Sequence, residues 1–538
     1  MDDDLEIEMI EKEGGREKTT KSKIEELLKR KIKSIEDSKT PVLYFFLSFF
    51  FAVSIRNFLE ASLYLHFYDL SAIFNIGNLI HFFSSYLALA FGITLLFYVA
   101  LDKPVIKILK IVLPTFIILN VAPIVDFTIR SITGNPGINI GYIIEGDLSN
   151  TLTRYLTYFG QFSPQSYGVT IGMKIEILII LILGFSYLYI SSSNLLKSAV
   201  FTLFLYTIIF WEMIAFPSLL MYVARQLGLN LVAHSTRVLT QSFFIIIFIL
   251  GTVIFFLYNK TYLKSIIKDI RPYRLIHYES MFFLGIVLAY TFTERTISVH
   301  YHIPTFFIIV ISIALTWLYS VFINNLEDIP IDTVTNEERP LIKGDIPLIT
   351  YKKLSWILLF VALIYAYLVS VVFLFLIITY MAGYFLYSAP PFRLKKVPVL
   401  SKAIISFNSL VLIIAGYWFV NYSLLTFPVK VVLILMLGFT MALNFIDIKD
   451  YEGDKEAGIS TLPGLIGLKR SKIVIGISFI ITYLSCYFIL QDVVFLAPLA
   501  LLGVLEFYLI NKEEYEENLI FIIYLSSLFF LMIILLFY

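Results

Sequence analysis

Residues 303–332 read IPTFFIIVISIALTWLYSVFINNLEDIPID, an apolar run followed directly by a polar and acidic segment. The run from 303 to 323 has the length of one membrane-spanning helix, because about 20 apolar residues cross the hydrocarbon core of a bilayer. The acidic residues Glu327, Asp328 and Asp332 follow the end of that run. This stretch therefore predicts a membrane helix that delivers carboxylates to one surface of the bilayer.

The composition of the whole chain points the same way. Of the 538 residues, 59% are hydrophobic and 15% are charged, and the mean hydropathy is +0.85. Soluble domains are about 45–50% apolar and about 25% charged. The composition excludes a soluble enzyme and predicts an all-α polytopic membrane protein. A formal net charge of +1 gives no reason to expect a nucleic acid as partner.

We expect fifteen spans in two groups, separated near residues 260–278. Six spans come first, at roughly 42–66, 72–100, 104–128, 173–193, 197–222 and 237–258. Nine follow, at roughly 279–297, 303–323, 353–370, 371–388, 403–421, 428–446, 472–490, 494–511 and 518–537. The expected organisation has three parts: a basic, amphipathic cytoplasmic tail (1–41), a six-helix transmembrane module of unknown role (42–260) and a nine-helix module (261–538).

Lysine and arginine predict the orientation, because they concentrate in cytoplasmic loops. The basic tail and the basic loops all fall on one side of the expected topology: 324–352, 389–402 and 447–471. The connections expected on the other side contain no Lys or Arg: 298–302, 421–427 and 491–493. We expect the N-terminus and the acidic loops in the cytoplasm. The tail shows no targeting peptide, so a prokaryotic plasma membrane is the expected location.

Two of these loops carry regularly spaced polar and acidic residues. Asn324, Asp328 and Asp332 are four residues apart, and so are Asp450 and Asp454. Residues at this spacing share one face of a helix, where like charges repel and require a compensating cation. Oxygen ligands suit Mg²⁺, which is typically held by one or two carboxylates together with substrate phosphates. The pattern predicts two facing carboxylate patches that hold Mg²⁺ and a diphosphate.

Several segments resemble the UbiA superfamily of intramembrane prenyltransferases. The first motif of that family, NDxxDxxxD, is matched at Asn324, Asp328 and Asp332. The second, DxxDxxGD followed by Gly and Thr-Leu, is matched by Asp447, Asp450, Gly453, Asp454, Gly458, Thr461 and Leu462. The stretch YSAPPFRLK at 387–395 resembles the family's Y-S-x-P-P-x-R-L-K loop, and Arg271-Pro272 resembles its opening RP. The resemblance covers roughly residues 265–538, and the count of nine spans agrees with the family.

The resemblance implies a Mg²⁺-dependent prenyltransferase with a polyprenyl diphosphate as donor and a hydrophobic or aromatic acceptor. The catalytic residues it implies are Asn324, Asp328, Asp332, Asp447, Asp450 and Asp454. Of these, the implied metal ligands are Asp328, Asp332, Asp450 and Asp454. Candidates to neutralise the diphosphate are Arg339, Lys343, Arg393 and Lys395. The acceptor stays open between an aromatic quinone precursor, a lipid such as geranylgeranylglyceryl phosphate, and a tetrapyrrole.

The first motif departs from the family pattern at two positions. Asn325 stands where Asp is usual, which removes one negative charge. Pro330 lies between Asp328 and Asp332, so either the helix breaks there or the ligands come from a turn. These departures leave an inactive copy open.

The alternative function is a membrane transporter, or a non-catalytic lipid-binding protein with acidic cation-binding loops. A transporter places its acids near the middle of the membrane, at broken helices. Here the paired acids fall at the ends of spans, which favours chemistry on a phosphate.

The first module resembles no family. Arg56 and Glu60 are four apart in its first span, and we expect them to form an ion pair. Glu212 in the fifth span is a functional candidate, because ionisable groups within a bilayer are costly.

Overall fold

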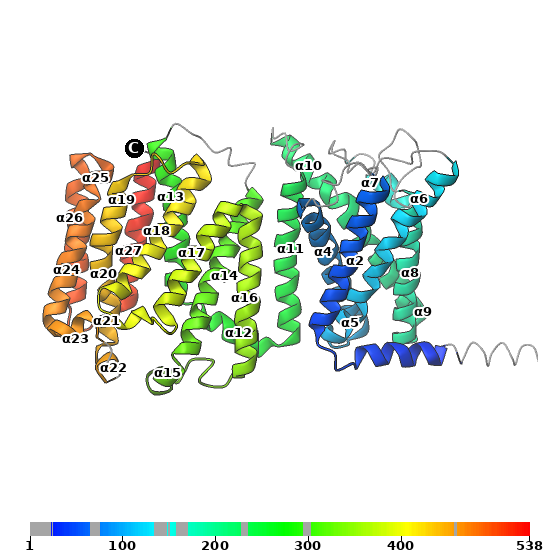
Figure 1. Cartoon of the computed structure of the whole chain (residues 1–538), viewed down its shortest axis with the longest axis horizontal. Helices are drawn as coiled ribbons and strands as arrows, with labels where there is room; N and C mark the ends of the chain where they lie inside the picture. The colour runs from blue at the N-terminus through cyan, green and yellow to red at the C-terminus, as the bar shows by residue number, and fades with distance from the viewer. Residues whose placement is uncertain are drawn as a thin grey trace, which may run out of the picture. The chain divides into compact units, whose positions relative to one another are not determined.

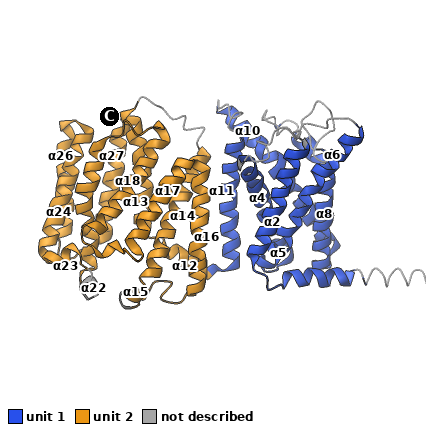
Figure 2. Ribbon diagram, viewed as in Figure 1, with its two compact units in different colours: residues 1–260 blue, residues 261–538 orange. Residues whose placement is uncertain are grey.

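The chain forms a helical protein with two compact units. The computed structural model describes residues 23, 25–64, 76–133, 148, 151–157, 170–227, 235–293, 303–456 and 460–537, without the side chains of 64, 76, 334, 335 and 454–456. Within these ranges there is no strand, and fifteen helical segments are long and apolar enough to cross a membrane. The predicted all-α membrane fold is confirmed. The units comprise Met1–Lys260 and Thr261–Tyr538 (Figure 2).

The first unit contains six of the candidate spans. Its helices are α2 (Val42–Tyr64), α4 (Ile76–Leu101), α5 (Val105–Thr115), η1 (Phe116–Asn120), α6 (Val121–Thr133), α7 (Thr151–Leu156), α8 (Ile171–Ser192), α9 (Leu195–Phe210), η2 (Trp211–Ala215), α10 (Phe216–Gln226) and α11 (Ser235–Tyr258) (Figure 1). A helix over residues 25–36 precedes them. Its Glu36 accepts hydrogen bonds from Lys103 at 2.6 Å and from the Tyr187 hydroxyl at 2.8 Å, which attach this helix to the unit.

A buried arginine joins three segments of the first unit. The guanidinium of Arg56 in α2 lies 3.1 Å from Glu60, so the expected ion pair is confirmed. It also lies 3.1 Å from Glu176 in α8 and donates to the carbonyl of Leu119 in η1. Because an unpaired charge is costly in a membrane interior, these contacts fix the mutual positions of α2, η1 and α8.

The second unit contains nine of the candidate spans. Its longer helices are α12 (Lys260–Asp269), α13 (Pro272–Phe292), α14 (Ile303–Glu327), α15 (Ile329–Thr335), α16 (Leu348–Val369), α17 (Val371–Ser388), α18 (Leu400–Asn421), α24 (Leu468–Ser485), α26 (Leu496–Asn511) and α27 (Glu517–Phe537). Shorter segments are η5 (Leu394–Lys396), α19 (Val429–Leu433), η6 (Ile434–Phe439), α20 (Thr440–Ala442), η7 (Leu443–Phe445), α21 (Ile446–Lys449), α22 (Tyr451–Glu456), α23 (Leu462–Ile466), α25 (Tyr487–Leu490) and η8 (Val493–Phe495). Figure 1 shows α12, α15, α22 and α23 at the same end of this bundle.

The first span of the second unit begins earlier than the sequence indicated. We expected it at 279–297, but α13 begins at Pro272, a residue that favours the first helical turn. The segment 272–278 falls outside the expected span because it contains polar and charged residues. In the structure, the buried ring of His277 lies 2.9 Å from the hydroxyls of Ser409 and Tyr524. These polar turns therefore face the interior of the bundle.

Two glycines allow α13 and α18 to pack with their backbones in close approach. A Cβ atom on Gly285 would lie 2.0 Å from the carbonyl oxygen of Ile413, and one on Gly416 would lie 1.9 Å from that of Phe282. Both distances are far shorter than any real contact. A side chain at either position would therefore push the two helices apart.

We predict that Gly416→Ala destabilises the protein by about 1–3 kcal/mol, because the added methyl group overpacks the α13–α18 contact. Thermal unfolding in detergent measures the effect. Gly92→Ala is the matched control, since a Cβ there would lie 3.5 Å from its nearest neighbour, an ordinary contact. An equal change in Tm for both variants would contradict the assignment of close packing to Gly416.

Candidate active site

A cavity of about 490 Å³ lies within the second unit and is lined by both acidic motifs. Asn324, Asp328 and Asp332 line it from the end of α14 and from α15. Asp447 and Asp450 line it from the end of α21. The two motifs are more than 100 residues apart in sequence, and the fold brings them to one space.

The first motif lies at a helix break. Helix α14 ends at Glu327, Asp328 stands at the N-terminal cap of α15, and Pro330 occupies one of the first positions of α15. Pro330 allowed either a broken helix or ligands supplied by a turn, and the structure shows the broken helix. The amide of Asp332 still donates to the carbonyl of Asp328 at 2.8 Å, so both carboxylates stay near one another.

Basic side chains from the loop after α17 hold Asp328. Arg393 donates to its Oδ1 at 2.9 Å, and Lys395 forms an ion pair with the same atom. Arg393 also donates to the carbonyl of Glu327 at 3.0 Å and so caps the C-terminus of α14. Asn324 donates from Nδ2 to Asp328 Oδ2 at 3.0 Å, which orients the carboxylate.

Asp332 is buried and pairs with Arg339. Burial raises the pKa of its carboxyl group, and Arg339 opposes that rise. Asn336 donates a further hydrogen bond to Asp332 at 3.2 Å. Arg339 also lines the cavity.

Asn325 faces away from the cavity and contacts two arginines. It is 1% exposed and does not line the cavity. Its Oδ1 accepts from Arg271 at 3.1 Å and from Arg339 at 3.2 Å, and its Nδ2 donates to the Tyr351 hydroxyl at 3.0 Å. Tyr351 in turn donates to Asp269 at 2.9 Å. The departure from the family pattern at position 325 therefore falls in a buried network.

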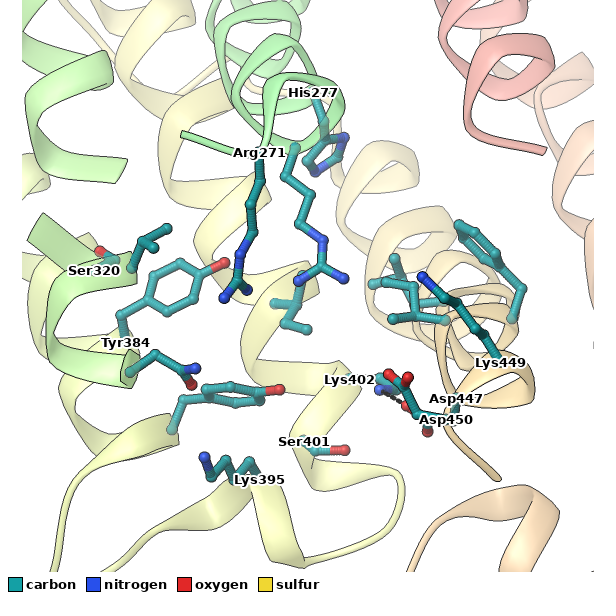
Figure 3. Close-up of a pocket in the computed structure, with 18 of the residues that line it drawn as sticks. Arg271, His277, Ser320, Tyr384, Lys395, Ser401, Lys402, Asp447, Lys449 and Asp450 are labelled. Carbon is teal, nitrogen blue, oxygen red and sulfur yellow. Dashed lines mark hydrogen bonds and ion pairs between the residues drawn. The ribbon is translucent and has the colours of Figure 1, made fainter. Parts of the chain in front are cut away.

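The second motif pairs with a lysine of α18. Lys402 is buried and lies 2.5 Å from Asp447 Oδ1. Asp450 is exposed, and no ion pair engages it within the part of the chain that is described. Figure 3 shows Arg271, Lys395, Lys402 and Asp450 around a common space. Among the motif carboxylates whose side chains are described, Asp450 is therefore the most available to a ligand.

Two predicted site residues, Lys343 and Arg393, are not among the residues that line the cavity. The side chain of Asp454, in α22, and the whole of Gly458 lie outside the described residues. Lys343 forms an ion pair with the exposed Glu338 and does not line the cavity. Lys343 therefore has no hydrogen bond or ion pair with the described residues of either motif.

The structure adds basic residues that the sequence analysis did not assign to the site. These are Arg271, Arg274, Lys402 and Lys449, all of which line the cavity. Burial lowers the pKa of Arg271 to about 10. Glu517, outside the cavity lining, lies 3.6 Å from Arg274 and 3.7 Å from Lys449. The Arg-Pro pair at 271–272, which resembles a family motif, could have indicated Arg271. Lys402 could not be distinguished from the basic residues that are common at the cytoplasmic ends of spans.

The donor set of the cavity fits a hard cation that shares its coordination with a ligand. Among the described residues, no three His, Cys, Asp or Glu side chains are grouped closely enough to enclose a metal alone. Mg²⁺ does not need such a cage, because it usually keeps several waters and uses one or two carboxylates plus substrate phosphates. Carboxylates from both motifs at one cavity meet that requirement.

The inner wall of the cavity is aromatic and leads to a second, apolar cavity. Trp317, Tyr278 and Tyr384 contact one another, with ring centroids 5.2–6.0 Å apart. The second cavity, about 120 Å³, shares Phe439 and two other aromatic residues with the first. The site therefore combines a charged end with an apolar extension.

Known proteins resemble this half of the chain. Residues 282–534 match the UbiA prenyltransferase family. A digeranylgeranylglyceryl phosphate synthase of Sulfolobus acidocaldarius is 28% identical over 261 residues, which cover 47% of this chain and 90% of the relative. A probable homogentisate phytyltransferase of Oryza sativa subsp. japonica is 33% identical over 164 residues, which cover 28% of this chain and 42% of the relative.

Among solved structures, a UbiA homologue from Archaeoglobus fulgidus bound to GPP and Mg²⁺ is 18% identical, with a TM-score of 0.41. The alignment covers 51% of this chain and 99% of that structure. The family match lies wholly within the second unit and confirms the resemblance carried by the motifs. The unit Thr261–Tyr538 is therefore a prenyltransferase module of the UbiA family.

Proposed function

We propose that the second unit transfers a polyprenyl group from its diphosphate to an acceptor in the cavity between the two acidic motifs, with Mg²⁺ as cofactor. One observation carries the proposal: carboxylates of both motifs and several basic side chains line one cavity that has an aromatic inner wall. A diphosphate needs cations around it, and a prenyl chain needs an apolar space.

Four carboxylates serve as the metal ligands in this proposal: Asp328, Asp332, Asp450 and Asp454. When bound, Mg²⁺ stabilises the charge that develops on the leaving diphosphate. Asn324 orients Asp328 through its hydrogen bond, and Asp447 holds Lys402 at the cavity. Arg339 and Lys395 neutralise the phosphate oxygens, as does Lys402 from α18. Arg393 acts through Asp328, which it holds in place. We assign no phosphate contact to Lys343.

The bond that breaks joins the allylic carbon to the diphosphate oxygen, and its electron pair leaves with the diphosphate. The acceptor then forms the new bond to the allylic carbon and loses a proton. Until that bond forms, the allylic cation needs a face rich in electron density. Trp317, Tyr278 and Tyr384 provide such faces, because aromatic rings attract cations through their quadrupoles. The apolar extension accommodates the chain.

The charge of the cavity favours an acceptor with an anionic group. Its lining includes six basic side chains: Arg271, Arg274, Arg339, Lys395, Lys402 and Lys449. Its described acidic side chains are four: Asp328, Asp332, Asp447 and Asp450. Magnesium ions would increase the positive charge further. An acceptor that carries a phosphate or a carboxylate complements this surplus better than a neutral one.

We place the cavity on the cytoplasmic side of a multi-pass membrane protein. The helix ends that form its mouth belong to the loops rich in Lys and Arg, which are retained in the cytoplasm.

We predict that purified protein releases pyrophosphate from geranylgeranyl diphosphate only with both Mg²⁺ and an acceptor. Asp328→Asn and Asp450→Asn should each lower kcat at least about 100-fold, because each removes charge stabilisation that acts on the leaving group. Glu338→Gln is the matched control, since it makes the same change at an exposed acid outside the cavity. Equal activity in the wild type, the two Asp→Asn variants and the control would contradict the assigned metal ligands.

We also predict that kcat/KM is higher for an anionic acceptor than for its neutral counterpart. Geranylgeranylglyceryl phosphate against geranylgeranylglycerol, and homogentisate against a hydroquinone without the carboxylate, are the two comparisons. A charge-assisted hydrogen bond contributes about 1.5–3 kcal/mol, which corresponds to roughly 10–150-fold. Higher kcat/KM for both neutral acceptors would contradict the proposed acceptor class.

A further inference from the structure

The buried amide of Asn325 lies behind the cavity wall, where every polar atom of its side chain has a defined role. Its oxygen accepts from two guanidinium groups, those of Arg271 and Arg339. Its nitrogen donates to the hydroxyl of Tyr351, and that hydroxyl donates a hydrogen bond to Asp269. The result is a continuous hydrogen-bonded chain from the end of α12 to two arginines that line the cavity.

The residues of this chain are fixed by packing. Tyr351 is fully buried, and its ring stacks on Phe322 with centroids 4.0 Å apart and planes 11° apart. Asp269 is 5% exposed and ends α12. The network therefore has little freedom to shift, and the arginines attached to it are held in place.

The direction of the hydrogen bonds distinguishes Asn from Asp at position 325. An amide donates to Tyr351 and leaves the tyrosine proton for Asp269, whereas a carboxylate only accepts. With Asp at 325, the single hydroxyl proton of Tyr351 would face two carboxylates. Asn at 325 and Asp at 269 are thus complementary. Carboxylates at both positions would leave one acceptor without a donor, whereas amides at both positions would remove a negative charge from beside the two arginines.

The charges lead to the same conclusion. The buried groups that meet here are two guanidinium groups and two carboxylates: Arg271, Arg339, Asp269 and Asp332. A third carboxylate at 325 would leave an unpaired negative charge, which is costly in a buried site. If Asp269 supplies this negative charge from α12, Asn325 leaves the total negative charge of the site unchanged.

We propose that Asp269, Tyr351 and Asn325 form a positioning network for Arg271 and Arg339, and that Asp269 takes over the charge that the first motif usually carries at position 325. Asn at position 325 is then compensated by the negative charge of Asp269 and does not indicate lost activity. The proposal rests on the proposed function, because Arg339 acts on the diphosphate there and Arg271 lines the same cavity.

Three variants test the network: Asn325→Asp, Asp269→Asn and the double variant. Each single variant should raise KM for geranylgeranyl diphosphate about tenfold, because it disturbs arginines coupled to the changed group. The double variant exchanges the two groups and should return KM to within about threefold of the wild-type value. Asn194→Asp is the control, since this helix-cap residue of the first unit accepts its bond equally well as a carboxylate.

A purely structural role would change Tm and leave KM alone in the protein that remains folded, so both quantities are measured for each variant. Recovery of KM in the double variant supports the network even where a single variant is too unstable to assay. A double variant with a KM no better than that of the worse single variant overturns it, and so does a normal KM in both single variants.

The proposed function fails separately, if wild-type protein releases no pyrophosphate with any acceptor. The affinities of the wild-type protein and the three variants for inorganic pyrophosphate with Mg²⁺ then decide the network, by the same pattern of loss and recovery. Absence of pyrophosphate binding in every protein overturns both proposals.

Discussion

Carboxylates that leave bulk water inside a membrane bundle must be paired or protonated, because an isolated buried charge costs several kilocalories per mole. The second unit applies this constraint to each buried acid of its two motifs. Asp328 has Arg393 and Lys395, Asp332 has Arg339, and Asp447 has Lys402. The partners come from the loop after α17, from the segment after α15, and from α18. The pairing therefore requires these segments to meet at one end of the bundle, and this meeting forms the cavity.

The same pairing prepares the site for a diphosphate. Basic groups that balance carboxylates in this structure are already placed where phosphate oxygens would bind. Charges held in position before a ligand arrives need little reorganisation, which is the main source of electrostatic stabilisation in enzymes. Because Asn324 and the backbone of Glu327 also contact this group of residues, the helix break at Asp328 is part of the arrangement. Pro330 thus favours the site, although it prevents a single continuous helix.

The parts of this structure that could be predicted from sequence are those that depend on local pattern. Apolar runs of sufficient length predicted the spans, and the i,i+4 pair Arg56–Glu60 predicted its own contact. Contacts between distant segments left no local signal. Glu176 lies 120 residues from Arg56. The network of Asp269, Tyr351 and Asn325 joins three separate helices. The start of α13 was misplaced because polarity along a helix does not reveal whether it faces lipid or the bundle interior.

The position of the acidic residues along their helices favours group transfer over ion transport as the function of this fold. A transporter needs a site near the middle of the membrane that can open to either side. Here α14 ends at Glu327 and α21 ends at Lys449, and the motif acids lie at or just beyond those ends. The aromatic wall and apolar extension lie on the inner side of the cavity, and the described lining of the extension is mostly apolar and contains no charged side chain. A molecule with a charged head and a long apolar chain fits the charged end of the cavity and its apolar extension together.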